Sequence, residues 1–134
     1  MNKAIIFTDG GARGNPGPAG IGVVIKDKGG KIIGEYNEYI GETTNNQAEY
    51  KAVLLALDKA EEMGFEDLEF YLDSKLVVEQ LNQNYKVKEP ELAKLFVKIW
   101  NKLQNFKKYS FAHVRREKNI EADAQVNLAL DNNI

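Results

Sequence analysis

Four acidic side chains of this 134-residue sequence lie in apolar surroundings, where a carboxylate is costly to bury unless it is paired or holds a metal ion. They are, in chain order, Asp9, Glu49, Asp73 and Asp123. Asp9 ends the apolar run 4–8, and Asp73 ends the run 68–72. Because the chain has no cysteine and one histidine, these carboxylates favour an oxygen-seeking ion, Mg²⁺ or Mn²⁺. Paired ions of this kind carry out phosphoryl chemistry.

Each of these acids also has a structural interpretation. Asp123 lies in the predicted last helix, where a first-turn acid is favoured by the helix dipole whether or not it binds metal. Glu49 is harder to explain in this way, because Ala52 and Ala56 follow it at the spacing of an inward helix face. The structural interpretation is weakest for Asp9 and Asp73, which follow buried strands.

Other catalytic chemistries find little support in the sequence. There is no cysteine nucleophile, no serine in a G-x-S-x-G turn, and His113 is the single histidine. The glycine-rich segment 10–17 lacks the G-K-[ST] end of a phosphate-binding P-loop. It is predicted to be a tight turn between two strands.

Basic residues are concentrated in one part of the chain. Residues 86–118 contain ten lysines and arginines and three acids, whereas 1–85 and 119–134 are acidic. Such a block predicts a surface for a polyanion. The alternative is a solvated helix face, because Lys94, Lys98 and Lys102 recur every four residues.

Hydrophobic periodicity and turn signals predict the elements that hold these residues. Strands are expected over 3–9, 20–27, 31–40, 67–73 and 108–114. Helices are expected over about 44–63, 74–83, 90–105 and 119–131. Thr44 and Gln47 predict a capping box, Gly64 a helix end, and Asn119 the N-cap of the last helix.

This order of elements predicts one α/β domain over 1–134, a mixed sheet with helices on its faces. Strands 3–9 and 67–73, joined through a helix, should run parallel, which would bring Asp9 and Asp73 together at their carboxyl ends. No apolar run approaches the roughly 20 residues of a membrane span. A cytoplasmic monomer is expected.

Four segments resemble, in order, the motifs of type 1 ribonucleases H. They are 8–18 (TDGGARGNPGP), 43–50 (TTNNQAEY), 72–74 (LDS) and 119–123 (NIEAD). The resemblance implies a ribonuclease H-like fold, a five-stranded mixed sheet of order 3-2-1-4-5 flanked by helices. The short connection before the last helix, and the short segment 84–89 where many members carry a basic handle, are similar to the archaeal-like branch.

The resemblance implies an endonuclease that cuts the RNA strand of RNA–DNA hybrids, leaves 5′-phosphate and 3′-hydroxyl ends, and needs no protein partner. Two Mg²⁺ ions would be bound, with Mn²⁺ as a substitute. Asp9 would bridge both ions, Asp123 would join it at the ion that activates water, and Glu49 and Asp73 would hold the other. Double-stranded RNA is a second candidate substrate. A hybrid-binding module without catalysis, or another phosphoesterase on this scaffold, are the alternatives.

The resemblance also implies a set of substrate-binding residues. They are Gly10, Gly11, Asn15, Thr44, Asn45, Asn46, Lys75, Lys86 and Lys88. The 10–14 backbone, Asn15, Asn45 and Glu49 would face the RNA strand, and Thr44 and Asn46 a phosphate of the DNA strand.

Two residues compete for an auxiliary role in product release. His113 matches the family's loop histidine in count, but it lies in a predicted strand, so Arg116 is preferred. Gln125 stands where an apolar residue is expected, and the sequence offers no reason for it.

Overall fold

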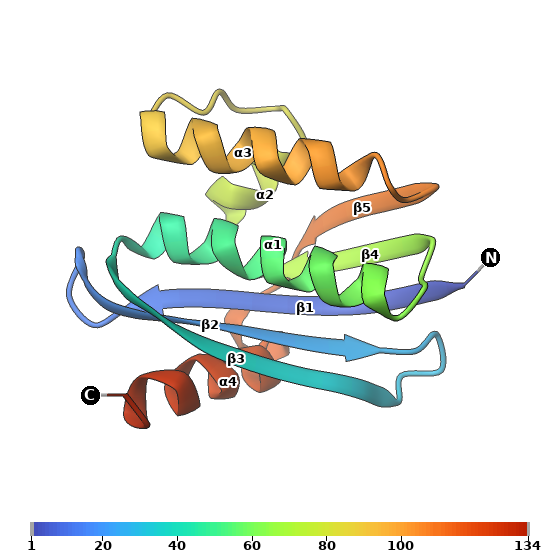
Figure 1. Ribbon diagram of the computed structural model, residues 1–134, viewed down its shortest axis with the longest axis horizontal. Coiled ribbons are helices and arrows are strands. Elements are labelled where there is room, and N and C mark those ends of the chain that lie inside the picture. Colours follow the sequence, from blue (N-terminus) through green and yellow to red (C-terminus); the bar gives the residue numbers. More distant parts are fainter. Residues whose placement is uncertain (1, 134) are drawn as a thin grey trace.

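Five strands form a single mixed sheet in the computed structural model, which describes residues 2–133 (Figure 1). The ends of the predicted domain, Met1 and Ile134, lie outside the described residues. The strand order is β3-β2-β1-β4-β5, which confirms the predicted order. The strands are β1 (Lys3–Ala12), β2 (Gly17–Lys26), β3 (Ile32–Thr43), β4 (Asp67–Leu72) and β5 (Lys108–His113).

Helices cover both faces of this sheet. The helices are α1 (Asn45–Glu62), α2 (Lys75–Leu81), α3 (Pro90–Leu103) and α4 (Ile120–Asp131). In Figure 1, α1, α2 and α3 lie on one side of the sheet, with α3 packed on α1, and α4 lies on the other side. A short 3₁₀ helix, Arg116–Lys118, connects β5 to α4. Among residues 2–133 no helix is long and apolar enough to cross a bilayer.

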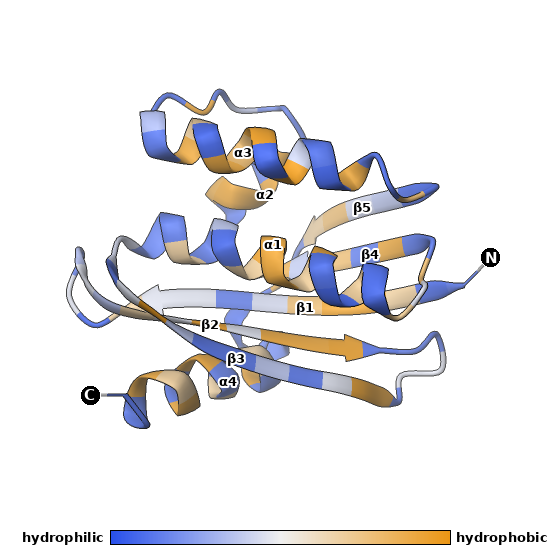
Figure 2. Ribbon diagram, in the orientation of Figure 1, coloured by the Kyte–Doolittle hydropathy of each residue, from blue (hydrophilic) through white to orange (hydrophobic). Residues whose placement is uncertain are grey.

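The main core lies between the sheet and the helices α1, α2 and α3. β2 is buried over most of its length, because helices pack on both of its faces. β3 is an edge strand, and Figure 2 shows its middle as largely hydrophilic. Its exposed edge therefore carries polar side chains, which discourage pairing with another sheet.

The register of two parallel strands places the first and third predicted acids next to each other. β1 and β4 pair in parallel, and the last matched residues are Phe7 and Tyr71. Asp9 and Asp73 each come two residues later along the chain, so both lie at the same level along the two strands. This confirms the arrangement expected from the helical crossover between the two strands.

The ends of several elements differ from the prediction. β1 continues to Ala12 instead of ending at Asp9, because Gly10 and the two residues after it pair with β2 in antiparallel register. β4 ends at Leu72, so Asp73 lies just beyond the strand, and Ser74 caps α2 by accepting a hydrogen bond from the Val77 backbone N–H. Gly10 and Gly11 therefore do not mark a turn, because both are still paired within the sheet.

Half of the predicted capping box is present at the start of α1. The Thr44 hydroxyl accepts a hydrogen bond from the backbone N–H of Gln47 at 3.2 Å, as predicted. The Gln47 side chain does not return to Thr44. Instead its Oε1 accepts a hydrogen bond from the Thr43 hydroxyl at 2.7 Å. The helix begins as expected, and the second contact ties it to the end of β3.

Two glycines allow the helices to contact the sheet backbone directly. A Cβ atom on Gly10 would lie 2.4 Å from the Ala48 carbonyl carbon and 2.6 Å from the Glu49 nitrogen, both in α1. On the opposite face, a Cβ on Gly22 would lie 2.3 Å from the Ala122 carbonyl oxygen in α4. Any larger residue would push the helix away. These contacts hold the helices that carry Glu49 and Asp123.

The contact at Gly22 predicts a large effect of a single methyl group. We expect Gly22→Ala to lower the free energy of unfolding by about 1–3 kcal/mol, because α4 must move to accommodate the Cβ. Urea denaturation measures this change. Gly11→Ala is the matched control, since its Cβ would meet nothing closer than Val126 Cγ1 at 3.9 Å. Equal stability of the two variants would contradict the close contact.

Candidate functional site

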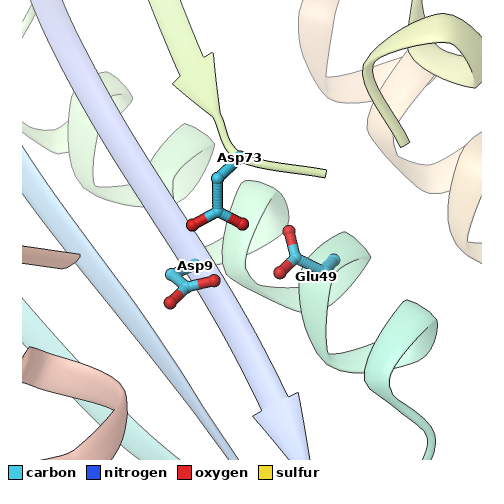
Figure 3. A group of neighbouring side chains, drawn as sticks. All are labelled: Asp9, Glu49 and Asp73. Carbon is cyan, nitrogen blue, oxygen red and sulfur yellow. The ribbon is translucent and has the colours of Figure 1, made fainter. Parts of the chain in front are cut away.

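Three of the four predicted acids converge beside β1, at the level where the neighbouring strand β4 ends. Asp9, Glu49 and Asp73 each offer a carboxylate oxygen, and these three atoms lie within 4.8 Å of one another. Figure 3 shows the three side chains, from β1, α1 and the residue after β4, pointing toward a common point. Asp9 is 8% exposed and Glu49 is 6% exposed. Three buried or half-buried carboxylates at this distance can bind one divalent cation.

Gly10 links the strand and the helix at this point. Its backbone N–H donates to Asp9 Oδ1 at 3.0 Å and to Glu49 Oε1 at 3.2 Å. This donor is available because α1 lies directly against Gly10, where no side chain separates the helix from the strand. The glycine therefore positions Glu49 toward Asp9 from within the strand, where the sequence had predicted a turn.

The convergence of these acids makes their ionised forms costly. Burial raises the pKa of Asp9 from 3.8 to about 7, and the charge of Asp73 contributes to the increase against a hydrogen bond with Glu49 that opposes it. Burial and the neighbouring charge of Asp9 raise the pKa of Glu49 well above 4.5. Without a cation, burial and the neighbouring charges therefore oppose full ionisation of Asp9 and Glu49.

The donor set fits a hard divalent cation. Glu49 Oε2 is buried and has no hydrogen-bond partner among residues 2–133. None of the ion pairs within the same range involves any of the three converging acids. Negative charge without a protein counter-charge, presented only by oxygen atoms, suits Mg²⁺ or Mn²⁺ better than a softer metal.

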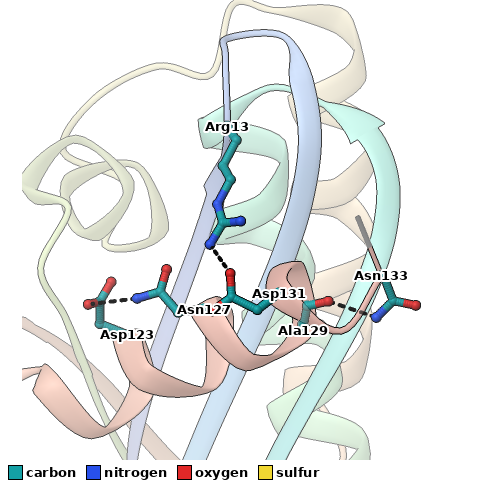
Figure 4. A network of polar contacts seen from close by, with 6 residues as sticks. All are labelled: Arg13, Asp123, Asn127, Ala129, Asp131 and Asn133. Carbon is teal, nitrogen blue, oxygen red and sulfur yellow. Dashed lines mark hydrogen bonds and ion pairs between the residues drawn. The ribbon is translucent and has the colours of Figure 1, made fainter.

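Asp123 lies in the same cavity but outside this group of three. It is exposed in the first turn of α4 and lines the cavity wall with the other acids. Its hydrogen bond from Asn127 Nδ2 is long, 3.5 Å (Figure 4). A hydrogen bond with Asp123 and the charge of its carboxylate also contribute to the raised pKa of Asp9. The structure thus brings three acids together tightly and places the fourth beside them.

The cavity above the acids has a volume of about 360 Å³ and a polar lining. Apart from the four acids, its lining residues are Gly10, Gly11, Asn45, Asn46, Ser74, Arg116 and Val126. Arg116 is the only cation in that lining. An acidic floor with amide and guanidinium groups at its rim is suited to a phosphate that arrives with metal ions.

Asparagine side chains brace the rim of this cavity. The Asn15 Oδ1 accepts a hydrogen bond from the backbone N–H of Asn45 at 3.0 Å, and the Asn45 Oδ1 accepts one from the Ala12 N–H at 2.8 Å. Both carboxamide oxygens are engaged by the backbone, so their amino groups are available as donors. The loop after β1 is also tied to the end of α4, where Arg13 pairs with Asp131 at 2.6 Å (Figure 4).

The predicted lysines lie outside the cavity lining. Lys75 begins α2, one residue after Ser74, and is exposed. Lys86 and Lys88 lie in the segment between α2 and α3. Lys86 lines a separate groove against α3. A substrate that reached them would have to extend from the acids across α2.

The structure separates the two auxiliary candidates. His113 is the last residue of β5, as its strand-like surroundings predicted, and it does not line the cavity. Its Nε2 lies 3.2 Å from the Asp73 carbonyl oxygen. Because a carbonyl can only accept, Nε2 must be the donor. Arg116 lines the cavity, which agrees with the preference for it, although its role stays a prediction.

Asn119 lies where the sequence predicted it, but its side chain has a different role from the one expected. It occupies the N-cap position of α4, but its side chain makes no cap hydrogen bond. Its Nδ2 donates instead to the Thr8 carbonyl at 2.9 Å and to Asp73 Oδ2 at 3.1 Å. Its position at the start of the fourth motif could have indicated a role in the site. The N-cap interpretation, however, already accounted for an asparagine at this position.

Gln125 has a structural role that the sequence did not reveal. This residue is 9% exposed on the face of α4 that contacts β3. Its Oε1 accepts a hydrogen bond from Asn37 at 2.9 Å, and its Nε2 donates to Glu35 at 3.3 Å. A polar edge strand thus supplies partners for a polar helix residue, which fixes α4 across the sheet.

Comparisons with known proteins agree with this architecture. A family model described as reverse transcriptase-like matches residues 7–129. The chain is 43% identical over 125 residues to ribonuclease HI of Halobacterium salinarum, covering 93% of this chain and 63% of that protein. It is 41% identical over 130 residues to the bifunctional protein Rv2228c of Mycobacterium tuberculosis, covering 96% and 36%. The chain thus spans less than two thirds of the length of these two relatives.

Solved structures are similar over nearly the whole chain. The crystal structure of RNase H1 from Halobacterium salinarum superposes with a TM-score of 0.95 at 42% identity, covering 97% of this chain and 98% of that one. LC11-RNase H1, isolated from compost and solved in complex with an RNA/DNA hybrid, superposes with a TM-score of 0.93 at 48% identity, covering 96% and 97%.

The raised pKa of Asp9 predicts how metal-free stability depends on pH. A carboxyl group whose pKa is higher in the folded state binds its proton more tightly there, so stability falls as pH rises from about 4 to about 7. In EDTA at pH 8 we expect Asp9→Asn to be more stable than the unmodified protein by about 1–2 kcal/mol, with the gain vanishing near pH 4. Thermal denaturation across this pH range measures it.

The control is Glu62→Gln, which removes a surface acid that is 66% exposed and pairs with Lys59. It should produce no comparable gain. A loss of stability in Asp9→Asn at pH 8 would contradict the electrostatic interpretation of the site.

Proposed function

The chain belongs to the type 1 ribonuclease H family, and we propose on that premise that it is a metal-dependent endonuclease that cuts the RNA strand of RNA–DNA hybrids. The observation that carries the proposal is the convergence of Asp9, Glu49 and Asp73 on one point, with no ion pair from a basic residue to any of them among residues 2–133. The hybrid bound to LC11-RNase H1 supports the choice of substrate. Residues 1–134 would act as one ribonuclease H domain and as a monomer.

We assign the metal ligands from the donor set. Asp9, Glu49 and Asp73 would hold one Mg²⁺ ion, and Asp9 and Asp123 a second, with Mn²⁺ as a substitute. When bound, these ions supply positive charge at the reacting phosphate and stabilise both the attacking and the leaving oxygen. Asp123 is exposed and loosely held, so it can adapt its carboxylate to the second ion and to the substrate.

Polar residues in and beside the cavity would orient the hybrid. The carboxamide oxygens of Asn15 and Asn45 are held by backbone N–H groups, which leaves their amino groups as donors suited to a ribose 2′-hydroxyl oxygen. The Gly10 and Gly11 backbone lets the RNA strand approach closely. Thr44 and Asn46 at the start of α1 would bind a DNA phosphate, which a helix N-terminus favours. Lys75 would contact the same duplex from α2.

Arg116 is assigned to the release of product. It is exposed and lines the cavity that holds the acids, so its guanidinium can reach a newly formed phosphate without being buried itself. His113 donates to the backbone of Asp73 and stands outside the cavity lining, so it has no direct role in this scheme.

Two alternatives predict different behaviour. A hybrid-binding module would bind without cutting, and it would have no use for the two buried acids Asp9 and Glu49, whose pKa values are raised by burial and by neighbouring carboxylates. A phosphoesterase for another substrate would cut without regard to a hybrid. Double-stranded RNA, which shares the 2′-hydroxyl, is the second substrate to test.

Cleavage of an end-labelled RNA–DNA hybrid tests the proposal. We expect the RNA strand alone to be cut, with Mg²⁺ or Mn²⁺ present and not in EDTA. Asp73→Asn should lower the rate by roughly 10²- to 10³-fold, because it removes a charged ligand at the reacting centre. Double-stranded RNA and double-stranded DNA are run beside the hybrid.

Asp67→Asn is the control, since it alters an aspartate at the opposite end of the same strand, β4. Its rate should match that of the unmodified protein. Tight binding of the hybrid without cleavage under any metal would leave only the binding module, and equal cutting of all duplexes would exclude a ribonuclease H.

The exposed lysines between α2 and α3 predict a specific salt dependence. If Lys86 and Lys88 contact phosphates, replacing each by alanine should reduce the slope of log binding constant against log salt concentration by about 1. Hybrid binding in Ca²⁺ at several KCl concentrations measures the slope. Lys28→Ala, in the turn between β2 and β3 at the far end of the sheet, should leave it unchanged. An unchanged slope in Lys86→Ala and Lys88→Ala would remove both residues from the interface.

A further inference from the structure

Asn119 connects three separate parts of the site through one side-chain amide. The residue is 1% exposed and lies between the 3₁₀ helix and α4. One hydrogen bond of its Nδ2 reaches the Thr8 carbonyl, immediately before Asp9, at 2.9 Å. The other reaches Asp73 Oδ2 at 3.1 Å. The middle of β1, the residue after β4 and the start of α4 are therefore joined at a single nitrogen.

The contacts of Asn119 come at a local cost to the helix. An asparagine at an N-cap ordinarily accepts a hydrogen bond from the first turn, which stabilises a helix by about 1 kcal/mol. In α4 this hydrogen bond is missing, and the Asn119 Oδ1 is buried with no partner among residues 2–133. Both features are unfavourable for folding alone. A side chain turned away from its cap and toward a carboxylate indicates a role in the site.

The geometry also explains why such a contact is needed. Asp9, Glu49 and Asp73 carry like charges in a confined space, so repulsion favours rotation of Asp73 away from the other two. Asp73 follows the end of β4, where no strand pairing restrains it. Asn119 holds its carboxylate, and His113 donates to its backbone carbonyl from β5, 3.2 Å away. The residue is thus fixed at its side chain and at its main chain.

We propose that Asn119 is a positioning residue that holds the Asp73 carboxylate in its metal-binding orientation before any ion arrives. This inference rests on the proposed function. In this role the Asn119 amide does not contact the reacting phosphate. Asn119 raises the affinity for the metal because it orients the Asp73 carboxylate before the ion binds, as residues that hydrogen-bond to metal ligands commonly do.

Two variants of Asn119 and a matched control test the proposal. Asn119→Ala removes the amide, and Asn119→Leu removes it while filling the buried volume, so at least one variant should fold. The control is Gln125→Leu, which removes another buried carboxamide with two hydrogen bonds from the same helix, directed at β3 instead of the acids. Circular dichroism confirms folding of each protein.

The first readout is direct metal binding, measured by calorimetric titration with Mn²⁺ in the absence of substrate. We expect both Asn119 variants to bind Mn²⁺ about 10- to 100-fold more weakly than the unmodified protein. The second readout is the Mg²⁺ concentration that gives half-maximal cleavage, which should rise by a similar factor, while the rate at saturating Mg²⁺ recovers most of its value. Hybrid binding in EDTA and both metal measurements on Gln125→Leu should be unchanged.

Different failures have different meanings. If the unmodified protein binds Mn²⁺ and cuts hybrid, and a folded Asn119→Leu does both at the same metal concentrations, Asn119 only supports the fold and the inference is overturned. The same conclusion follows if Gln125→Leu shifts the metal dependence equally. If the unmodified protein neither binds Mn²⁺ nor cuts, the proposed function fails and the positioning role fails with it.

Discussion

Direct contact between helices and the sheet backbone is the constraint on which this molecule depends. At Gly10 the backbone of α1 lies against β1, and at Gly22 the backbone of α4 lies against β2 on the other face. Each contact is closer than any side chain would permit. Since Glu49 lies at the first contact and Asp123 follows Ala122 at the second, the packing of the fold also decides where two of the acids point. Stability and site geometry are therefore set by the same atoms.

The close packing at Gly10 concentrates negative charge that the protein does not neutralise. Burial makes the ionised forms of Asp9 and Glu49 costly, and their pKa values rise accordingly. A divalent cation removes the penalty by supplying the missing charge, so the folded protein without metal carries a strain that binding relieves. The hydrophobic core next to the site, in which Tyr50 and Phe70 are fully buried, keeps the acids together in spite of their electrostatic repulsion.

The site combines fixed and adaptable residues. Asp9, Glu49 and Asp73 are held by Gly10 and Asn119, whereas Asp123 and Arg116 are exposed side chains that line the same cavity. A fixed group of ligands binds an ion in a defined place, and exposed side chains can adjust to a phosphate as it changes from substrate to product. This division suits a reaction in which charge at phosphorus is stabilised mainly by positioning.

The sequence by itself determined the positions of the strands and of most helices, the parallel course of β1 and β4, and the four acids, whereas the full strand order followed from the resemblance of its motifs to type 1 ribonucleases H. Periodic burial and turn residues are local properties, and a helical crossover forces β1 and β4 to run parallel. Only the tertiary structure decided how Asn119 and Gln125 are used and that Asp123 stands apart from the other acids. Their partners lie far away along the chain, 111 residues for Asn119 and Thr8, 88 for Gln125 and Asn37. A side chain at the end of a helix has local and distant partners of similar energy, so packing selects between them.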